Sequence, residues 1–220
     1  MQTIRTVAGH FDWAVANEFG LYFTGDDPNV FGAVQRLDLD TFAMTHEYDA
    51  GLAFEEEHRY GVLTYLTLAP GGLLFALGTI GDDEEIVCFD ARTLEVRHRF
   101  GRGLFNDPGV YGMAAVGNEL FVLDGASNTI KAFSLAGSHL RDISLGACRR
   151  PEDLYHFDGR LYLRDADDED TRIVVLTPEG ERLQVWRPDG DREIVSLIGI
   201  YGRKLLMQTA NDGYGRDVRR

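Results

Sequence analysis

Residues 111–145 read YGMAAVGNELFVLDGASNTIKAFSLAGSHLRDISL. Short runs rich in apolar residues, at 111–116, 120–123, 130–135 and 140–145, are divided by turns that contain Gly, Asn or Asp. Such runs between turn signals indicate β-strands joined by hairpins, because Gly, Asn and Asp accept the backbone conformations of tight turns. The stretch therefore predicts one four-stranded antiparallel sheet.

The same arrangement recurs along the chain. Its second-strand cores are Leu21-Tyr22-Phe23, Leu73-Leu74-Phe75, Leu120-Phe121-Val122, Leu161-Tyr162-Leu163 and Leu205-Leu206-Met207, which begin 52, 47, 41 and 44 positions apart. A period near 45 residues made of short strands is typical of a β-propeller with one blade per repeat. We predict an all-β, five-bladed β-propeller in a single domain over residues 1–220. The expected blades span about 10–50, 62–101, 109–146, 152–188 and 194–220.

The two ends of the chain suggest how the ring closes. After the last core there is room only for a third strand near 216–219, whereas residues 3–8 alternate as the outer strands of the other repeats do. We expect this N-terminal strand to complete the fifth blade, which removes the open sheet edges. The alternative is a partial ring completed by a second copy or a partner chain.

Two segments carry a resemblance to known families. Residues 107–133 resemble the NHL-type propeller repeat, and residues 89–94 are similar to the strand and turn of YVTN and quinoprotein-like propellers. The resemblance implies a fold superfamily rather than an activity. Gluconolactonase-like and virginiamycin-lyase-like propellers use a divalent metal, but no residue here matches their sites. The Phe-Thr-Gln-Gly-Leu segment of plant-type glutaminyl cyclases is absent.

Charge and hydropathy exclude several classes of partner. The net charge is -14, and Lys131 and Lys204 are the only lysines, so we expect no nucleic-acid partner. No run approaches 18 apolar residues and residues 1–5 contain no hydrophobic signal core, so we expect no membrane span and a cytoplasmic protein. Cys88 lies in an apolar run and Cys148 in a loop, so no disulfide framework is expected.

Basic residues recur in the connections between blades. In a propeller these connections share one face with the loops between second and third strands, where ligands commonly bind. The candidate ligand-binding residues are Arg59, Arg102, Arg149, Arg150 and Arg192, together with His156 on an inner strand. Arginines placed in this way could bind an anionic group, and local ion pairing is the alternative. For His156 the alternative is a buried core histidine.

Aromatic and acidic residues gather near the same loops. A subset of the aromatic residues Phe54, Tyr60, Phe105, Tyr111, Tyr155 and Tyr201 could line a pocket, although most should be core. The densest acidic run includes Asp165, Asp167 and Asp168, which could hold Ca²⁺ through carboxylate oxygens. It is not an EF-hand, because Asp170 replaces the required Gly and Leu176 the bidentate Glu. A solvated loop is the alternative.

Catalytic signatures are missing from the sequence. There is no Gly-x-Ser-x-Gly, His-Glu-x-x-His, Cys-x-x-Cys or phosphate-loop motif. We therefore expect a non-enzymatic binding module that presents its charge-rich loops to a protein or a small anionic ligand, without a cofactor. The alternative is a metal-dependent hydrolase or lyase, similar to lactonases, that uses the acidic residues and possibly Ca²⁺. A lectin would need near-identical loops in each blade, and these loops differ.

Overall fold

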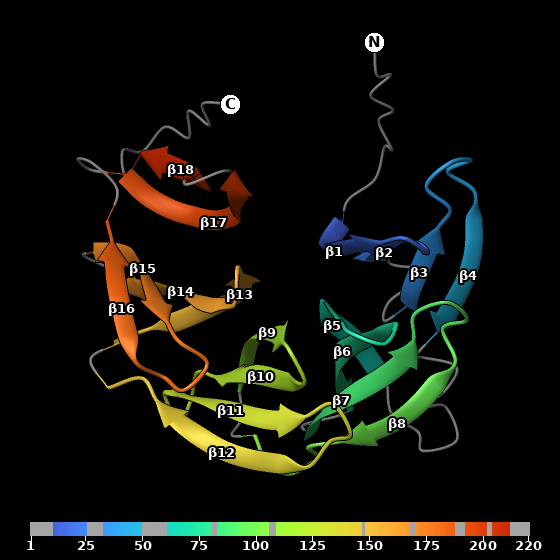
Figure 1. Ribbon diagram of the computed structural model, residues 1–220, viewed down its shortest axis with the longest axis horizontal. Helices are drawn as coiled ribbons and strands as arrows, with labels where there is room; N and C mark the ends of the chain where they lie inside the picture. Colours follow the sequence, from blue (N-terminus) through green and yellow to red (C-terminus); the bar gives the residue numbers. More distant parts are fainter. Residues whose placement is uncertain are drawn as a thin grey trace. The chain divides into compact units, whose positions relative to one another are not determined.

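The computed structural model describes residues 11–25, 33–49, 61–80, 83–105, 109–146, 148–167, 170–187, 192–201 and 204–211. The chain forms two compact units, residues 1–105 and 106–220, and each is described by itself. All regular elements in the described ranges are β-strands (Figure 1). None of the described segments is a helix long and apolar enough to span a membrane.

The first unit contains two four-stranded sheets. One consists of β1 (Phe11–Asn17), β2 (Gly20–Gly25), β3 (Ala33–Leu37) and β4 (Met44–Asp49). The other consists of β5 (Gly61–Ala69), β6 (Leu73–Ile80), β7 (Asp83–Asp90) and β8 (Val96–Phe100). In both sheets the strands pair antiparallel in sequence order.

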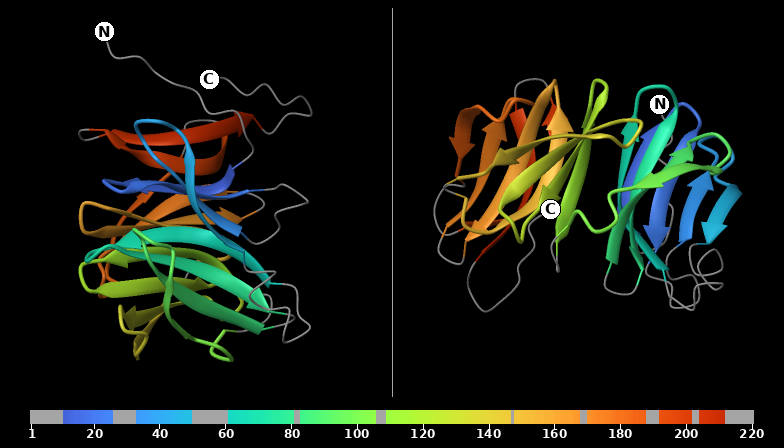
Figure 2. Two further views of the ribbon diagram at one scale, coloured as in Figure 1. Left: turned by 90° about the vertical axis from the view of Figure 1, so that its right-hand side faces the viewer. Right: turned by 90° about the horizontal axis from the view of Figure 1, so that it is seen from below.

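The second unit contains two further four-stranded sheets and a hairpin. The sheets consist of β9 (Val110–Val116), β10 (Glu119–Asp124), β11 (Thr129–Ser134) and β12 (His139–Ser144), and of β13 (Pro151–Phe157), β14 (Arg160–Asp167), β15 (Asp170–Leu176) and β16 (Arg182–Trp186). The hairpin consists of β17 (Arg192–Tyr201) and β18 (Lys204–Asn211). Figure 2 shows neighbouring strands of each sheet running in opposite directions.

The strand pattern expected from the sequence is present. All five predicted cores lie on the second strand of a sheet or hairpin, namely β2, β6, β10, β14 and β18. In the third repeat, each strand begins and ends within one residue of its predicted run. The β13–β14 turn, whose residues Asp158 and Gly159 are of the types that favour tight turns, has φ of 49° at Asp158 and 71° at Gly159, as a type I′ hairpin turn requires.

A β-bulge occurs at the same place in the outer strand of each four-stranded sheet. The register skips one residue near the start of the fourth strand, and the skipped residues are Thr45, Arg97, Leu140 and Leu183. A bulge disrupts the regular ladder of an edge strand and increases its twist, which hinders pairing with another chain. The repeat therefore includes its own protection of the exposed edge.

The first strands of neighbouring sheets pack together within each unit. β1 contacts β5 in the first unit, and β9 contacts β13 in the second. Gly112 of β9 lies against the main chain of β13, so that a Cβ atom there would stand 2.6 Å from the nitrogen of Leu154. Gly112 is therefore needed for the close approach of β9 and β13.

Each unit has its own apolar core between its sheets. Tyr22, Leu74 and Phe89 are among the buried residues of the first unit, and Phe121, Leu161 and Val174 are among those of the second. Cys88 is a buried free thiol, and Cys148 is a half-buried free thiol. The predicted N-terminal strand at 3–8 and the predicted strand near 216–219 lie outside the described residues.

Candidate functional site

A pocket lies in the second unit, where the β10–β11 turn faces the segment that leads into β13. Its volume is about 280 Å³. The lining residues are Tyr111, Gly125, Ala126, Arg149, Arg150, Pro151 and Glu152. The pocket thus combines an aromatic ring and small apolar groups with three charged side chains, a composition suited to binding a small group in a fixed orientation.

The aromatic wall depends on a glycine. A Cβ atom on Gly125 would lie 2.3 Å from Cδ2 of Tyr111, so the ring of Tyr111 covers the main chain at this position. The N–H of Gly125 donates to the carbonyl oxygen of Gly109 at 2.8 Å. The turn is therefore fixed to the start of β9, and any larger side chain at residue 125 would displace the ring.

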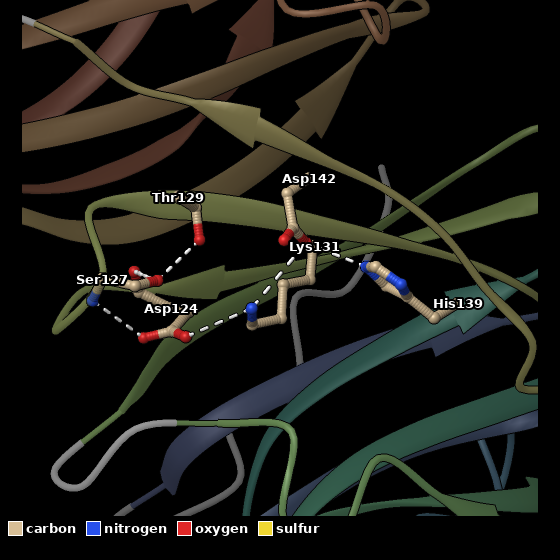
Figure 3. Close-up of polar contacts among 6 residues, drawn as sticks. All are labelled: Asp124, Ser127, Thr129, Lys131, His139 and Asp142. Carbon is tan, nitrogen blue, oxygen red and sulfur yellow. Dashed lines mark hydrogen bonds and ion pairs between the residues drawn. The ribbon is translucent and has the colours of Figure 1, made fainter.

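The buried side chain of Asp124 fixes the conformation of the β10–β11 turn (Figure 3). Its Oδ1 accepts a hydrogen bond of 3.1 Å from the N–H of Ser127, and its Oδ2 lies 3.6 Å from Nζ of Lys131. Lys131 also approaches Asp142 at 3.7 Å, and Asp142 contacts His139 at 2.8 Å. This row of charges extends from the turn to the outer strand β12, so the turn is anchored to the whole sheet.

Buried Asp165 holds the opposite wall. The N–H groups of Arg149 and Arg150 donate to its Oδ1 at 3.0 and 2.8 Å. Nε and Nη2 of Arg172 donate to its Oδ2 at 2.9 and 2.7 Å. The main chain of the two pocket arginines is therefore fixed by a carboxylate that is fully buried, and their side chains remain exposed.

Asn128 joins the two walls. Its side-chain Nδ2 donates a hydrogen bond of 3.1 Å to the main-chain carbonyl oxygen of Cys148. The main-chain carbonyl oxygen of Asn128 accepts one of 3.1 Å from the N–H of Leu145. Asn128 has φ of 54°, a left-handed conformation that Asn tolerates better than most residues. These bonds couple the β10–β11 turn to the segment that carries Arg149 and Arg150.

Glu152 brings a negative charge into the pocket. It is the extra residue of a bulge in β13, since Pro151 pairs with Asp165 and Asp153 with Arg164. Its Oε1 lies 2.8 Å from Nε of Arg150, and its Oε2 lies 2.6 Å from Nη2 of Arg164. Arg164 also contacts Asp153 at 2.5 Å. Burial raises the pKa of Asp153, and the charge of Arg164 opposes this rise.

The structure brings two of the predicted ligand-binding residues together, Arg149 and Arg150. Arg102 is exposed in the first unit and lies 3.2 Å from Asp83, which is a local ion pair. Arg59 lies outside the described residues, and Arg192 begins β17 without a described side chain. Of the aromatic candidates, Tyr111 lines the pocket.

His156 differs from the core histidine that was the alternative for it. It lies near the end of β13 and its side chain is exposed. Its Nε2 accepts a hydrogen bond of 3.1 Å from the N–H of Gly159, and loss of hydration lowers its pKa. The ring caps the β13–β14 turn, at the opposite end of the hairpin from the pocket.

Two of the three predicted acidic residues occupy a strand rather than a loop. Asp165 lies within β14 and Asp167 ends that strand, whereas Asp168 lies outside the described residues. The sequence prediction treated the whole acidic run as a loop, either a Ca²⁺ site or solvated, and so missed that Asp165 is buried within a strand. No group of three or more metal-binding side chains occurs among the described residues.

Several lining residues could not be identified from the sequence. Gly125, Ala126 and Pro151 contribute through the path of the main chain, and the bulge that directs Glu152 depends on strand register. The signal that was available is the pair Asp124 and Asp165, which follow the apolar second-strand runs, Asp124 directly and Asp165 after Arg164. A carboxylate at the end of such a run is expected to accept hydrogen bonds when it is buried.

No protein-family model and no curated sequence matches the chain. Solved structures do. One is a protein of unknown function from Bacteroides caccae, with a TM-score of 0.63 and 13% identity over 94% of this chain and 73% of that one. Another is streptogramin B lyase, with a TM-score of 0.59 and 15% identity over 90% of this chain and 63% of the lyase. A chain of a nidogen/laminin complex also matches, with a TM-score of 0.58 and 13% identity over 77% of this chain and 60% of that one. This chain spans less than two thirds of the latter two.

These likenesses identify the fold. The chain has a β-propeller fold in which each four-stranded sheet is one blade, and the resemblance predicted from the sequence is confirmed at the level of the fold. At identities of 13 to 15% the likeness shows the fold alone. By their names, the matched structures include both enzymes and proteins that bind other proteins.

Proposed function

We propose that the chain is a binding module whose pocket at Arg149 and Arg150 receives an anionic group of a small ligand or of a protein partner. The observation that carries the proposal is the placement of two exposed arginines in a pocket of about 280 Å³. Arginine suits this role because its planar guanidinium binds carboxylate or phosphate through two parallel hydrogen bonds. We keep the cytoplasmic location, and the absence of nucleic-acid and membrane partners, as part of this proposal.

Preorganisation supports the assignment. Asp165 holds the main chain of both arginines, and Asp124 holds the facing turn. A site whose backbone is already fixed loses less conformational entropy when a ligand binds. The buried carboxylates therefore favour binding without contacting the ligand.

The metal-dependent hydrolase or lyase has weaker support. Both oxygens of Asp165 accept hydrogen bonds from nitrogen donors, and Arg172 neutralises its charge. A cation at this carboxylate would have to displace Arg172. The binding module is therefore the preferred function.

We also propose that β17 and β18 begin a fifth blade that the N-terminal strand at 3–8 completes. The support is that β17 contacts β13, β14 and β15 as a further inner strand would, while the hairpin supplies only two strands. Removal of residues 1–8 should lower the melting temperature by several degrees, because an open blade edge loses its partner. An unchanged melting temperature would contradict closure by this strand.

The binding proposal is tested with two anions that share a phenyl ring, benzoate and phenyl phosphate. Titration followed by NMR should show saturable binding of at least one of them to the wild-type chain. Arg149→Ala combined with Arg150→Ala should remove it, because alanine keeps the main-chain bonds to Asp165 but not the guanidinium groups. Arg160→Ala is the matched control. Arg160 lies next to the β13–β14 turn, at the end of that hairpin away from the pocket, so this variant should bind the anions as the wild type does. If neither anion binds the wild-type chain, the proposal is wrong.

A further inference from the structure

Resting on the proposed function, we infer that the pocket binds a small aromatic acid, whose ring packs against Tyr111 while its anionic group reaches Arg149 and Arg150. Tyr111 is the residue that selects the uncharged part of this ligand. Two features of the structure support the assignment, the β-bulge that places Tyr111 in the pocket and the contact of its ring with Gly125.

A β-bulge directs Tyr111 into the pocket. Tyr111 directly follows the residue of β9 that pairs with Asp124, and the register of the two strands shifts at this point. Glu152 directly follows the residue of β13 that pairs with Asp165, at an equivalent bulge. Bulges re-aim side chains and are over-represented next to functional sites. The bulge residues of two neighbouring inner strands thus line one pocket.

The blade itself does not require a tyrosine at this position. β1 has a bulge at the same place, and the residue there is Asp12, whereas in β13 it is Glu152. Tyr111 is half-buried, packs against the apolar core of the second unit and also lines the pocket. An aromatic side chain at a position that the fold leaves free is therefore available to contact a ligand.

Gly125 sets the position of the ring. A Cβ atom at residue 125 would lie 2.3 and 2.6 Å from Cδ2 and Cε2 of Tyr111, and 3.3 Å from the carbonyl oxygen of Pro151. The nearest ring atoms are thus the two along one edge, so Tyr111 turns this edge toward Gly125. The faces of the ring and its other edge are left for contact with an occupant of the pocket.

The next sheet shows that this glycine belongs to the pocket rather than to the repeat. Ala166 of β14 occupies the place of Gly125 in the second unit's other sheet. The N–H of each donates to a main-chain carbonyl just before the first strand of its own sheet, at 2.9 and 2.8 Å. Alanine is accepted in β14, where the bulge residue is Glu152. Glycine is needed only where the bulge residue is Tyr111.

The pocket has room for a single ring with its anionic group. A cavity of about 150 Å³ is enough to hold benzene, and this pocket has a volume of about 280 Å³. Ala126 and Pro151 line it together with Tyr111. Aromatic rings attract one another in both offset-stacked and edge-to-face arrangements. A ring of the ligand would therefore gain from contact with either a face or an edge of Tyr111.

The test compares benzoate with cyclohexanecarboxylate, its saturated analogue, in NMR titrations of the wild-type chain. The two ligands carry the same charge, and the saturated ring has the larger apolar surface, so burial alone would favour cyclohexanecarboxylate. Contact between aromatic rings should reverse this order, and we expect benzoate to bind about threefold more tightly. If only phenyl phosphate binds the wild-type chain, the same comparison is made between phenyl phosphate and cyclohexyl phosphate.

Tyr111→Leu should remove the preference for the aromatic ligand, because leucine keeps an apolar wall but has no ring. Gly125→Ala keeps Tyr111 but displaces its ring, and it should weaken the binding of the aromatic ligand about threefold or more. Phe157→Leu is the matched control. It replaces another half-buried ring of the second unit, at the end of β13 away from the pocket, and should keep the wild-type ratio.

The outcomes separate the inference from the proposed function. Equal or tighter binding of the saturated ligand to the wild type, or an unchanged ratio in Tyr111→Leu, would overturn the inference while leaving anion binding intact. If Tyr111→Leu does not fold, unchanged binding of the aromatic ligand to Gly125→Ala would overturn it. Binding of none of these anions to the wild type would refute the proposed function and the inference with it.

Discussion

The two units differ at one equivalent position of their sheets. The sixth residue of the second strand is Gly25 or Gly78 in the first unit, whereas it is Asp124 or Asp165 in the second. A Cβ atom on Gly78 would contact Val87 and Leu63 at 3.3 and 3.4 Å, which are apolar neighbours. Asp124 and Asp165 instead accept main-chain N–H groups from the loops of the pocket.

The comparison separates fold from function in this repeat. The same sheet forms with glycine or aspartate at this position, so the residue is not needed for the blade itself. The aspartates occur where loops are held in a defined conformation, and the pocket lies between those loops. A buried polar residue that interrupts the repeat pattern therefore indicates a place where loop geometry is fixed.

The largest effect is expected for Asp165→Asn. The substitution removes the charge that pairs with Arg172 and turns an amide toward N–H donors, so breaking this buried pair should cost about 3 to 5 kcal/mol of unfolding free energy. Urea unfolding measures the loss. Asp158→Asn, an exposed carboxylate on the same hairpin, should change stability little. If the two substitutions lowered the free energy of unfolding by similar amounts, the buried aspartate of the second unit would have no special structural role.

The reverse exchange, Gly78→Asp, should cost about 2 to 4 kcal/mol, because the atoms nearest to the new Cβ belong to Val87, Leu63 and the carbonyl group of Glu85, and none of these atoms donates a hydrogen bond to a carboxylate. Gly78→Ala is the steric control and should cost less than about 1 kcal/mol. If Gly78→Asp and Gly78→Ala lower the free energy of unfolding equally, the sheet of the first unit accepts aspartate at this position as the sheets of the second unit do.

Gly112 and Gly78 differ in the atoms that a new methyl group would contact. Gly112→Ala should lower stability by about 1 to 3 kcal/mol, because the new methyl group would stand 2.6 Å from the Leu154 main chain and push β9 away from β13. The new methyl group of Gly78→Ala would have its nearest contacts with side chains that can shift, at 3.3 and 3.4 Å, and would meet main chain only at the ordinary contact distance of 3.6 Å. Chemical denaturation of the two variants should rank Gly112→Ala as clearly the less stable, and the opposite ranking would contradict the packing described for β9.

The smallest effect concerns an ion pair on the surface of the second unit. Both oxygens of Glu119 accept from Arg141, at 2.8 and 2.7 Å, and these bonds lower the pKa of Glu119 below its ordinary value of 4.5. The stabilisation is therefore present above the pKa of the unfolded chain and is lost as the pH falls through the lower native pKa.

Glu119→Gln should accordingly cost about 0.5 to 1 kcal/mol at pH 7 and nearly nothing once the carboxyl of the wild type is protonated. Unfolding curves of both chains from pH 7 to pH 3 measure the difference. A constant difference across this range would show that the charge of Glu119 plays no part.

The blades could be predicted from the sequence because strand periodicity and turn residues are local signals. The run Leu120–Val122 and the turn at 158–159 illustrate this. Blade topology also predicted that the segment of Arg149 and Arg150 lies near the β10–β11 turn, and both residues line the pocket there, while their role in binding stays a prediction. The role of Asp165 was not, because its partners are main-chain N–H groups about 15 residues away and Arg172 on another strand. Glu152 depends on a bulge, and register shifts leave no local sequence signal.

The most direct test of the central claim is the change in main-chain amide NMR shifts when benzoate is added to the wild-type chain. We expect the largest changes at Gly125, Ala126 and Glu152, which line the pocket on its two sides. The turns at the other end of these sheets, around Gly117 and Gly159, should remain unchanged. Changes centred on those turns, or no saturable change at the pocket residues, would contradict the account.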